Sequence, residues 1–264
     1  MSNHWMSEPL PEYERPPVVE TALAVEFAQL PGWNVVHFGA LWERFKAEYP
    51  SFETHPYVNP FIPGEFSFDN PPLRCFFVDV EGTQVVQVRS GAFVRNWRAR
   101  PQNNIYPRYA TIRPSFERDF QTFGQFLQEF RFAPLEIWKC EVTYINHFVH
   151  GREWEDVLSL SRILPILSPD RMSGLLTNIS HARFAVGFEL PEDAGTLQVE
   201  LVPLISPEGK QVMQLGLTAV GRPRGSDVSS ILEWLDKGHY AVVKGFSEFT
   251  SIDSQRQYWG REWR

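Results

Sequence analysis

The 264-residue sequence lacks the short motifs that carry the commonest enzyme chemistries. It has no GxxxxGK[ST] loop and no GxGxxG pattern, so we expect no nucleotide or dinucleotide chemistry. It also lacks GxSxG, HExxH and CxxC, which argues against a serine hydrolase, a zinc protease and a cysteine-pair site. The sequence therefore assigns no catalytic residue, no metal and no cofactor. These absences favour a protein that is not an enzyme.

Cysteine and long apolar runs are also scarce. Cys75 and Cys140 are the two cysteines, and both lie in apolar strand-like runs, so we expect buried free thiols. The first 17 residues, MSNHWMSEPLPEYERPP, contain no apolar segment typical of a signal peptide. No stretch approaches the 18 apolar residues of a spanning helix. These features predict a cytoplasmic protein with no membrane partner.

Positive charge is in deficit, since the formal net charge is −7. Nucleic-acid binding depends on clustered cations that neutralise phosphates. The overall charge thus argues against general affinity for nucleic acid, although it leaves room for a local basic patch.

Aromatic residues are abundant, at 14% of the chain, with 21 Phe and 9 Trp. Each buried aromatic side chain removes about 150–250 Å² from water. This surplus has two interpretations: a core built on Phe and Trp, or a hydrophobic groove that receives a ligand or partner.

The hydrophobic pattern predicts an α+β fold of antiparallel sheets with packed helices. Alternation with a period of two indicates eight strands, over 18–27, 74–80, 83–89, 92–97, 135–148, 183–190, 196–205 and 211–221. Apolar stripes at helical spacing indicate four helices, over 36–49, 115–130, 153–164 and 226–249. Six prolines over 50–72 predict a long irregular connection, and Ser115 is a plausible N-cap.

The order strand, helix, three strands, helix occurs twice along the chain. We therefore predict a flexible arm over 1–17, a first α+β unit over 18–132 and a second over 133–264, which also holds the C-terminal tail. A tandem duplication explains this repeated order, although the halves share no evident sequence identity. The alternative is one α+β domain whose halves merely resemble each other.

One candidate ligand-binding segment lies where the strand over 135–148 ends. It contains Tyr144, Asn146, His147, His150 and Glu153. Sites often lie at such strand ends. The two histidines and the glutamate are spaced by three, which on a helix converges on a metal ion. A glycine interrupts this segment, however, so hydrogen-bonded histidines at a polar strand end are the favoured interpretation.

A second candidate is a patch of basic and aromatic residues, Arg95, Trp97, Arg98 and Arg100. Arginine pairs with phosphate, and bases stack on tryptophan, so this patch suits nucleic acid or a protein partner. In a strand Arg95 and Trp97 share a face, and Arg98 opposes them. An edge strand guarded by charge explains the same pattern.

Two further features lie near the C-terminus. His239 stands among apolar residues and is interpreted as a core or boundary histidine. The tail aromatics Tyr258, Trp259 and Trp263 are predicted to dock back on the body, with contact to a partner as the alternative.

Four stretches carry a family resemblance: PPVVETALAVEF, the run from NW to YPRY, EVTYINHF and WGRE. Over residues 16–260 the chain resembles a sporadically distributed family of bacterial and archaeal proteins of about this length. The resemblance implies no assigned activity and no catalytic residue. A scattered distribution is compatible with mobile-element, defence or toxin–antitoxin roles.

These observations favour a non-catalytic binding or interaction protein, with an unknown protein partner or with self-association. One alternative is a small-molecule binder or enzyme that uses a cleft between a sheet and a long helix. The other is a nucleic-acid binder that uses the basic and aromatic patch.

Overall fold

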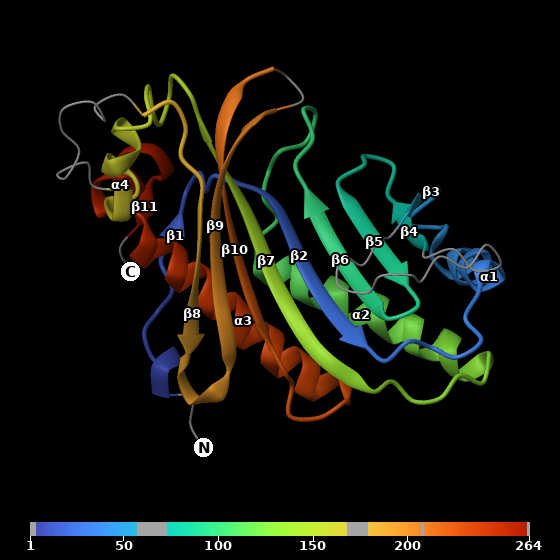
Figure 1. The fold of residues 1–264 in the computed structure, drawn as a ribbon. Helices are drawn as coiled ribbons and strands as arrows, with labels where there is room; N and C mark the ends of the chain where they lie inside the picture. The colour runs from blue at the N-terminus through green and yellow to red at the C-terminus, as the bar shows by residue number, and fades with distance from the viewer. Residues whose placement is uncertain (1–3, 57–72, 168–178, 207–208, 263–264) are drawn as a thin grey trace. The chain divides into compact units, whose positions relative to one another are not determined.

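A computed structural model describes residues 4–56, 73–167, 179–206 and 209–262 of the chain (Figure 1). The chain forms two compact units, and neither is one continuous segment. Unit 1 consists of Met1–Glu20, Val142–Gly221 and Asp236–Arg264. Unit 2 consists of Thr21–Glu141 and Arg222–Leu235. The predicted units over 18–132 and 133–264 follow chain order, whereas these compact units interleave.

The elements confirm an α+β fold. The helices are α1 (Val35–Phe45), α2 (Tyr109–Glu129), α3 (Val228–Phe249) and α4 (Ile252–Trp259). The strands are β1 (Glu12–Tyr13), β2 (Val18–Phe27), β3 (Ser51–Pro56), β4 (Leu73–Val78), β5 (Gln84–Arg89), β6 (Ala92–Arg98), β7 (Ile137–Val149), β8 (Phe184–Leu190), β9 (Gly195–Ile205), β10 (Gln211–Gly221) and β11 (Arg261–Glu262).

The hydrogen-bonded strand order is β3-β4-β5-β6-β2 in unit 2 and β7-β10-β9-β8 in unit 1, with β1 and β11 as a separate pair. The pairs β3–β4, β4–β5, β5–β6, β9–β10 and β8–β9 are antiparallel. In β9–β10 the register places Glu200 opposite Gly216 and Gln198 opposite Thr218. Opposed residues point to the same face of a sheet, so this register decides which side chains meet.

In unit 2, α2 packs its phenylalanine stripe against the strands. Phe116, Phe120 and Phe123 each contact the ring of Phe93 on β6, at centroid distances of 5.3 to 5.9 Å. Phe123 also contacts Phe27 on β2. The aromatic surplus of the sequence therefore builds a core here, because these rings are buried.

Unit 2 also buries a charged cluster between α2 and β6. Asp119 accepts hydrogen bonds from Arg95 Nε at 2.9 Å and from the Tyr49 hydroxyl at 2.7 Å. Arg118 donates to the other carboxylate oxygen of Asp119. Arg95 and Asp119 are only 3% and 2% exposed, so each charge depends on the other. Burial raises the pKa of the Tyr49 hydroxyl well above its usual range.

In unit 1, one face of strands β7, β10, β9 and β8 packs against the part of α3 that begins at Asp236 (Figure 1). Leu215 and Leu217 on β10 are fully buried on that face. Gly245 permits a close approach, since a Cβ atom there would overlap Leu197 Cδ2. Helix α3 therefore continues through its glycines. At Gly245, close packing against Leu197 compensates for the low helix propensity of glycine.

The terminal segments of unit 1 are tied together by Gln255, which is fully buried on α4. Its side-chain amide donates to Thr250 O, and its carbonyl oxygen accepts from Tyr13 and Arg261. Burial raises the pKa of the Tyr13 hydroxyl to about 12. Within the predicted flexible arm over 1–17, residues 12 and 13 form β1, which pairs with β11, and Tyr13 is buried.

Three predicted elements differ from the structure. The second helix begins at Tyr109 rather than at Ser115 and includes Pro114, because Ile112 is buried and holds the extra turn in place. Residues 153–164 form turns and a short 3₁₀ helix, Ser159–Arg162, instead of an α-helix. Strand β3 lies inside the predicted irregular connection; the remainder of that connection, over 57–72, lies outside the described residues.

The order of elements recurs between the halves of the chain. Strand β2, the meander β4–β6 and helix α2 correspond to β7, the meander β8–β10 and helix α3. The strand order is likewise β4-β5-β6-β2 in one half and β8-β9-β10-β7 in the other. The duplication that we predict from the sequence would explain this correspondence.

Both cysteines are buried free thiols, as predicted. Burial raises the pKa of each thiol to about 12, and the neighbouring Glu141 adds to this effect at Cys140. In the described part of the chain, no helix is long and apolar enough to span a membrane.

We expect Asp119→Ala to lower the free energy of unfolding by about 3–5 kcal/mol, because it leaves the buried charge of Arg95 unpaired. Urea unfolding followed by circular dichroism measures this loss. Glu117→Ala is the matched control on the same helix, since Glu117 pairs with Arg113 in a partly exposed position and should lose far less. Equal losses in both variants would contradict the structural role of the buried cluster.

Candidate polar hollow on the open face of unit 1

The strands of unit 1 present a polar face opposite the one that packs on α3. Along β10, Met213, Leu215, Leu217 and Ala219 are buried, while Gln214 and Thr218, which alternate with them, are partly exposed. The alternation follows from strand geometry, because successive side chains point to opposite faces. We call this second surface the open face.

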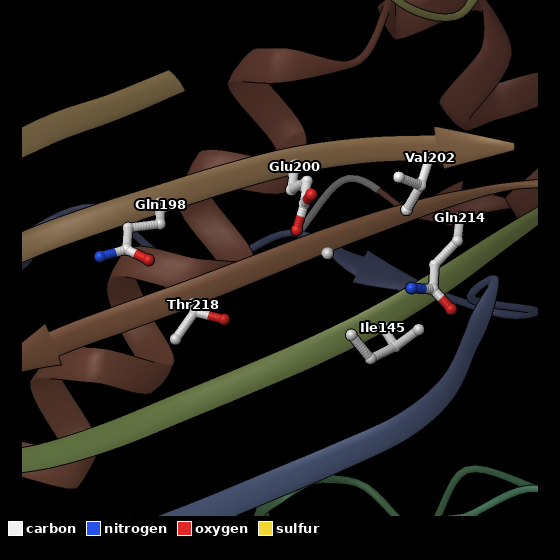
Figure 2. A pocket seen from close by; sticks show the side chains of 7 residues that line it. Ile145, Gln198, Glu200, Val202, Gln214 and Thr218 are labelled. Atoms are coloured by element: carbon white, nitrogen blue, oxygen red, sulfur yellow. The ribbon is translucent and has the colours of Figure 1, made fainter. Parts of the chain in front are cut away.

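The open face contains a hollow of about 110 Å³ that is centred on three strands (Figure 2). Its lining comes from β7, β9 and β10: Ile145, Gln198, Glu200, Val202, Gln214, Gly216 and Thr218. Gly216 has no side chain to fill the space, and a Cβ atom there would stand 3.4 Å from Ile145 Cδ1. The hollow therefore exists because a glycine occupies an outward position in the middle of a strand.

Hydrogen bonds fix the polar groups around the hollow. The hydroxyls of Thr143 and Thr218 lie 3.0 Å apart, and His147 Nε2 lies 3.2 Å from Gln214 Oε1. Figure 2 shows Gln198 and Glu200 on one strand, and Gln214 and Thr218 on the next. The lining offers a carboxylate, two amides and a hydroxyl, but no His, Cys or Lys. Such groups bind and orient a polar partner.

Glu200 supplies the negative charge of the hollow. Its side chain is 50% exposed and accepts a hydrogen bond from Arg183 Nη2 at 3.0 Å. The Arg183 side chain is itself 68% exposed. Exposed ion pairs of this kind contribute about 0–1 kcal/mol and are screened by salt. Arg183 therefore holds Glu200 weakly, and a competing cation can replace it.

The structure separates the first candidate segment into three environments. Tyr144 and Asn146 point toward the core, where the Asn146 amide donates to Leu215 O at 3.2 Å. His147 lies on the open face beside Gln214. His150 and Glu153 lie in the turn after β7. Of these five residues, only His147 approaches the hollow.

The turn after β7 explains the other two residues. Glu153 is buried, accepts the backbone N–H of Val149 at 2.8 Å and pairs with Arg152. His150 Nε2 lies 2.9 Å from the carbonyl oxygen of Glu155. Among the residues that the structure describes, no three metal-ligating side chains cluster. His150 and Glu153 therefore hold the turn after β7 together, and the two histidines do not converge on one site.

Tyr144 meets His239 in the core of unit 1, where its hydroxyl lies 3.0 Å from His239 Nδ1. Burial lowers the pKa of His239 to about 4, although nearby Asp236 acts in the opposite direction. The imidazole is therefore neutral at physiological pH. His239 is half-buried against the core, in agreement with its interpretation as a core or boundary histidine.

The basic and aromatic patch does not form one exposed surface. Arg95 and Trp97 are buried on the α2 side of β6, with Arg95 bonded to Asp119. Arg98 and Arg100 both donate through Nε to the carbonyl oxygen of Gly82. Two of the four residues are thus enclosed in the core of unit 2.

Trp259 is fully buried on α4, with its ring 5.3 Å from Phe148 and 5.0 Å from Phe246. The tail is docked up to this point, as the sequence predicts. Trp263 lies outside the described residues.

Sequence reasoning missed the residues that line the hollow. Gln198, Glu200, Gln214 and Thr218 fit the alternation of half-buried strands, so nothing in their type marks a site. The available signal is Gly216, because glycine inside a strand often marks a close approach by a ligand or another backbone.

Comparison with known proteins adds no relative, since neither a protein-family model nor a curated protein matches the chain. The binding site proposed below therefore depends on the geometry of the described residues.

The burial of His239 predicts a pH dependence of stability. The unfolded chain protonates a histidine near pH 6.5, whereas the folded protein keeps His239 neutral down to about pH 4. The free energy of unfolding should therefore fall as the pH drops through this window, by about 3 kcal/mol at its lower end, and should be unaffected above it.

Urea unfolding between about pH 7.5 and pH 4.5 tests this effect. His239→Gln should flatten the pH dependence, while His150→Gln, at an exposed position, should leave it unchanged. Parallel pH profiles for the wild type and His239→Gln would show that the imidazole is accessible to protons in the folded state.

Proposed function

We propose that this chain is a non-catalytic interaction protein that binds a protein partner on the open face of unit 1. The hollow beside Gly216 receives the end of one cationic side chain, lysine or arginine, from that partner. The observation that carries the proposal is the placement of the Glu200 carboxylate and two side-chain amides around an outward-facing glycine.

Size favours a side chain over a metabolite. Pockets for small molecules usually enclose about 300–1,000 Å³, whereas this hollow encloses about 110 Å³. A guanidinium or ammonium group with its last methylene suits the smaller volume. The alternative site, a cleft between the strands and α3, has little room. Buried side chains such as Leu215, Leu217 and Phe246 fill that space.

Charge supports the same choice. The Glu200 carboxylate and the Gln198 side-chain oxygen accept hydrogen bonds, and guanidinium and ammonium groups carry only donors. The net charge of −7 attracts a basic partner over a distance and accelerates its encounter with the protein. The observed ion pair between Arg183 and Glu200 shows how a guanidinium pairs with this carboxylate. The proposed partner would make the same contact with its own cationic side chain.

The setting of the proposal comes from the sequence. We infer a cytoplasmic, bacterial protein with a role in a mobile-element or defence context, on the basis of the family resemblance. Nucleic-acid binding stays the weaker alternative, because the net charge is negative and because Arg95 and Trp97 are buried.

The binding chemistry can be tested with a defined probe. N-acetyl-arginine amide, titrated into ¹⁵N-labelled protein, should shift the backbone resonance of Gly216 and the side-chain amides of Gln198 and Gln214. N-acetyl-citrulline amide, which has nearly the same shape without the charge, should shift them far less. Equal shifts with both probes, or none, would overturn the proposed recognition of a cation.

Substitutions then connect the hollow with a natural partner. Glu200→Gln should abolish the arginine-dependent shifts and the recovery of a stoichiometric protein partner in affinity purification from the host. Glu189→Gln is the matched control, since Glu189 is exposed on the same face of neighbouring β8 but does not line the hollow. Partner recovery that is unchanged by Glu200→Gln would place the interaction elsewhere.

A further inference from the structure

We propose that two copies of this chain associate through strand β8, which pairs antiparallel with β8 of the second copy and joins their sheets edge to edge. This contact uses the margin of the sheet and not the hollow, so it goes beyond the proposed function. It commits to a second copy as the occupant of the edge.

β8 is the last strand in the sheet order, so only one of its sides is hydrogen bonded to a neighbouring strand, β9. In the part of the chain that the structure describes, no backbone hydrogen bond joins residues 184–190 to anything outside that ladder. An edge strand of seven residues with unpaired N–H and C=O groups is a template for another strand. Figure 1 shows β8 at one margin of the sheet.

The strand itself carries few of the usual means of protecting an edge, with Glu189 as its one charged residue. Residues 184–189 contain no lysine and no proline, and the helix-side positions Phe184, Val186 and Phe188 are apolar. Phe188 is 43% exposed although its ring contacts Phe249 on α3. Added apolar surface from a neighbouring strand would complete its burial. The other edge strand, β3, differs because it carries Glu53 and His55 and ends at Pro56.

Strand geometry fixes the register of such a pair. The two copies are related by a two-fold axis perpendicular to the sheet. Their apolar side chains then lie on the same face only if even-numbered residues pair with even-numbered residues, and odd with odd. One residue must then face its own counterpart, and the register that pairs all seven residues places Gly187 opposite Gly187. Val186 then faces Phe188, and Phe184 faces Leu190.

The side chains are complementary in this register. Both cross-strand pairs on the helix side are apolar, which stabilises an antiparallel pair. On the opposite side Glu189 faces Ala185 of the second copy, so no like charges meet. Arg183 lies diagonally from Glu189 of the second copy, within the reach of a long side chain. At the centre, Gly187 faces Gly187, so no side chains clash there.

The register makes a sharp prediction for Gly187. Gly187→Lys should weaken dimerisation at least about fivefold, because two lysines would then face each other across the axis. The fold should tolerate the change, since a Cβ atom at Gly187 meets nothing within 4 Å. Sedimentation velocity and light scattering over a roughly hundredfold range of protein concentration measure the association.

Two matched variants complete the experiment. Gly187→Ser adds a side chain without charge and should dimerise like the wild type. Ala185→Lys adds the same charge two residues away, where it faces Glu189 of the second copy, and should preserve or strengthen the dimer. Circular dichroism and the urea midpoint confirm that each variant is folded.

Each outcome bears on the proposal. A wild-type protein that stays monomeric over the whole concentration range would overturn it. A dimer that persists in Gly187→Lys, or that Ala185→Lys disrupts equally, would overturn the proposed register and edge. Glu200→Gln should leave the dimer unchanged, so that a failure of this proposal is distinguishable from a failure of the proposed partner site.

Discussion

The constraint on which the structure of each unit depends is the burial of one strand face against a long amphipathic helix. In unit 2 the phenylalanines of α2 cover Phe93 and Phe27, and in unit 1 the second part of α3 covers Leu215 and Leu217. Because strand side chains alternate, covering one face commits every intervening residue to the other face. The open face of unit 1 is therefore a direct consequence of core formation.

Buried polar groups add specificity to this apolar packing. A buried charge is tolerated only when it is paired and hydrogen bonded. Asp119 meets that condition through Arg95, Tyr49 and Arg118, which fixes α2 against β6. Gln255 plays a similar part in unit 1 without charge, because its single amide bonds to segments that are far apart in sequence. These contacts select one arrangement where hydrophobic packing alone would permit several.

The two proposed surfaces arise from the same strands in different ways. The hollow depends on side chains, since a glycine opposite Glu200 leaves space among polar groups on the open face. The edge of β8 depends on the backbone, since the last strand of a sheet has one row of unpaired groups. Partner binding and self-association therefore need not compete, and a dimer would present two hollows to one partner or to two.

The sequence by itself determined the α+β class, most of the strands and the buried thiols, because periodicity and residue type report local burial directly. Tertiary structure alone decided the rest. Arg95 and Trp97 look like a basic and aromatic patch until Asp119, 24 residues away, draws the arginine into the core. His147, His150 and Glu153 share a spacing by three, but the turn after β7 places them in different environments. The hollow was not predictable because its lining residues come from three strands, and only the register between strands brings them together.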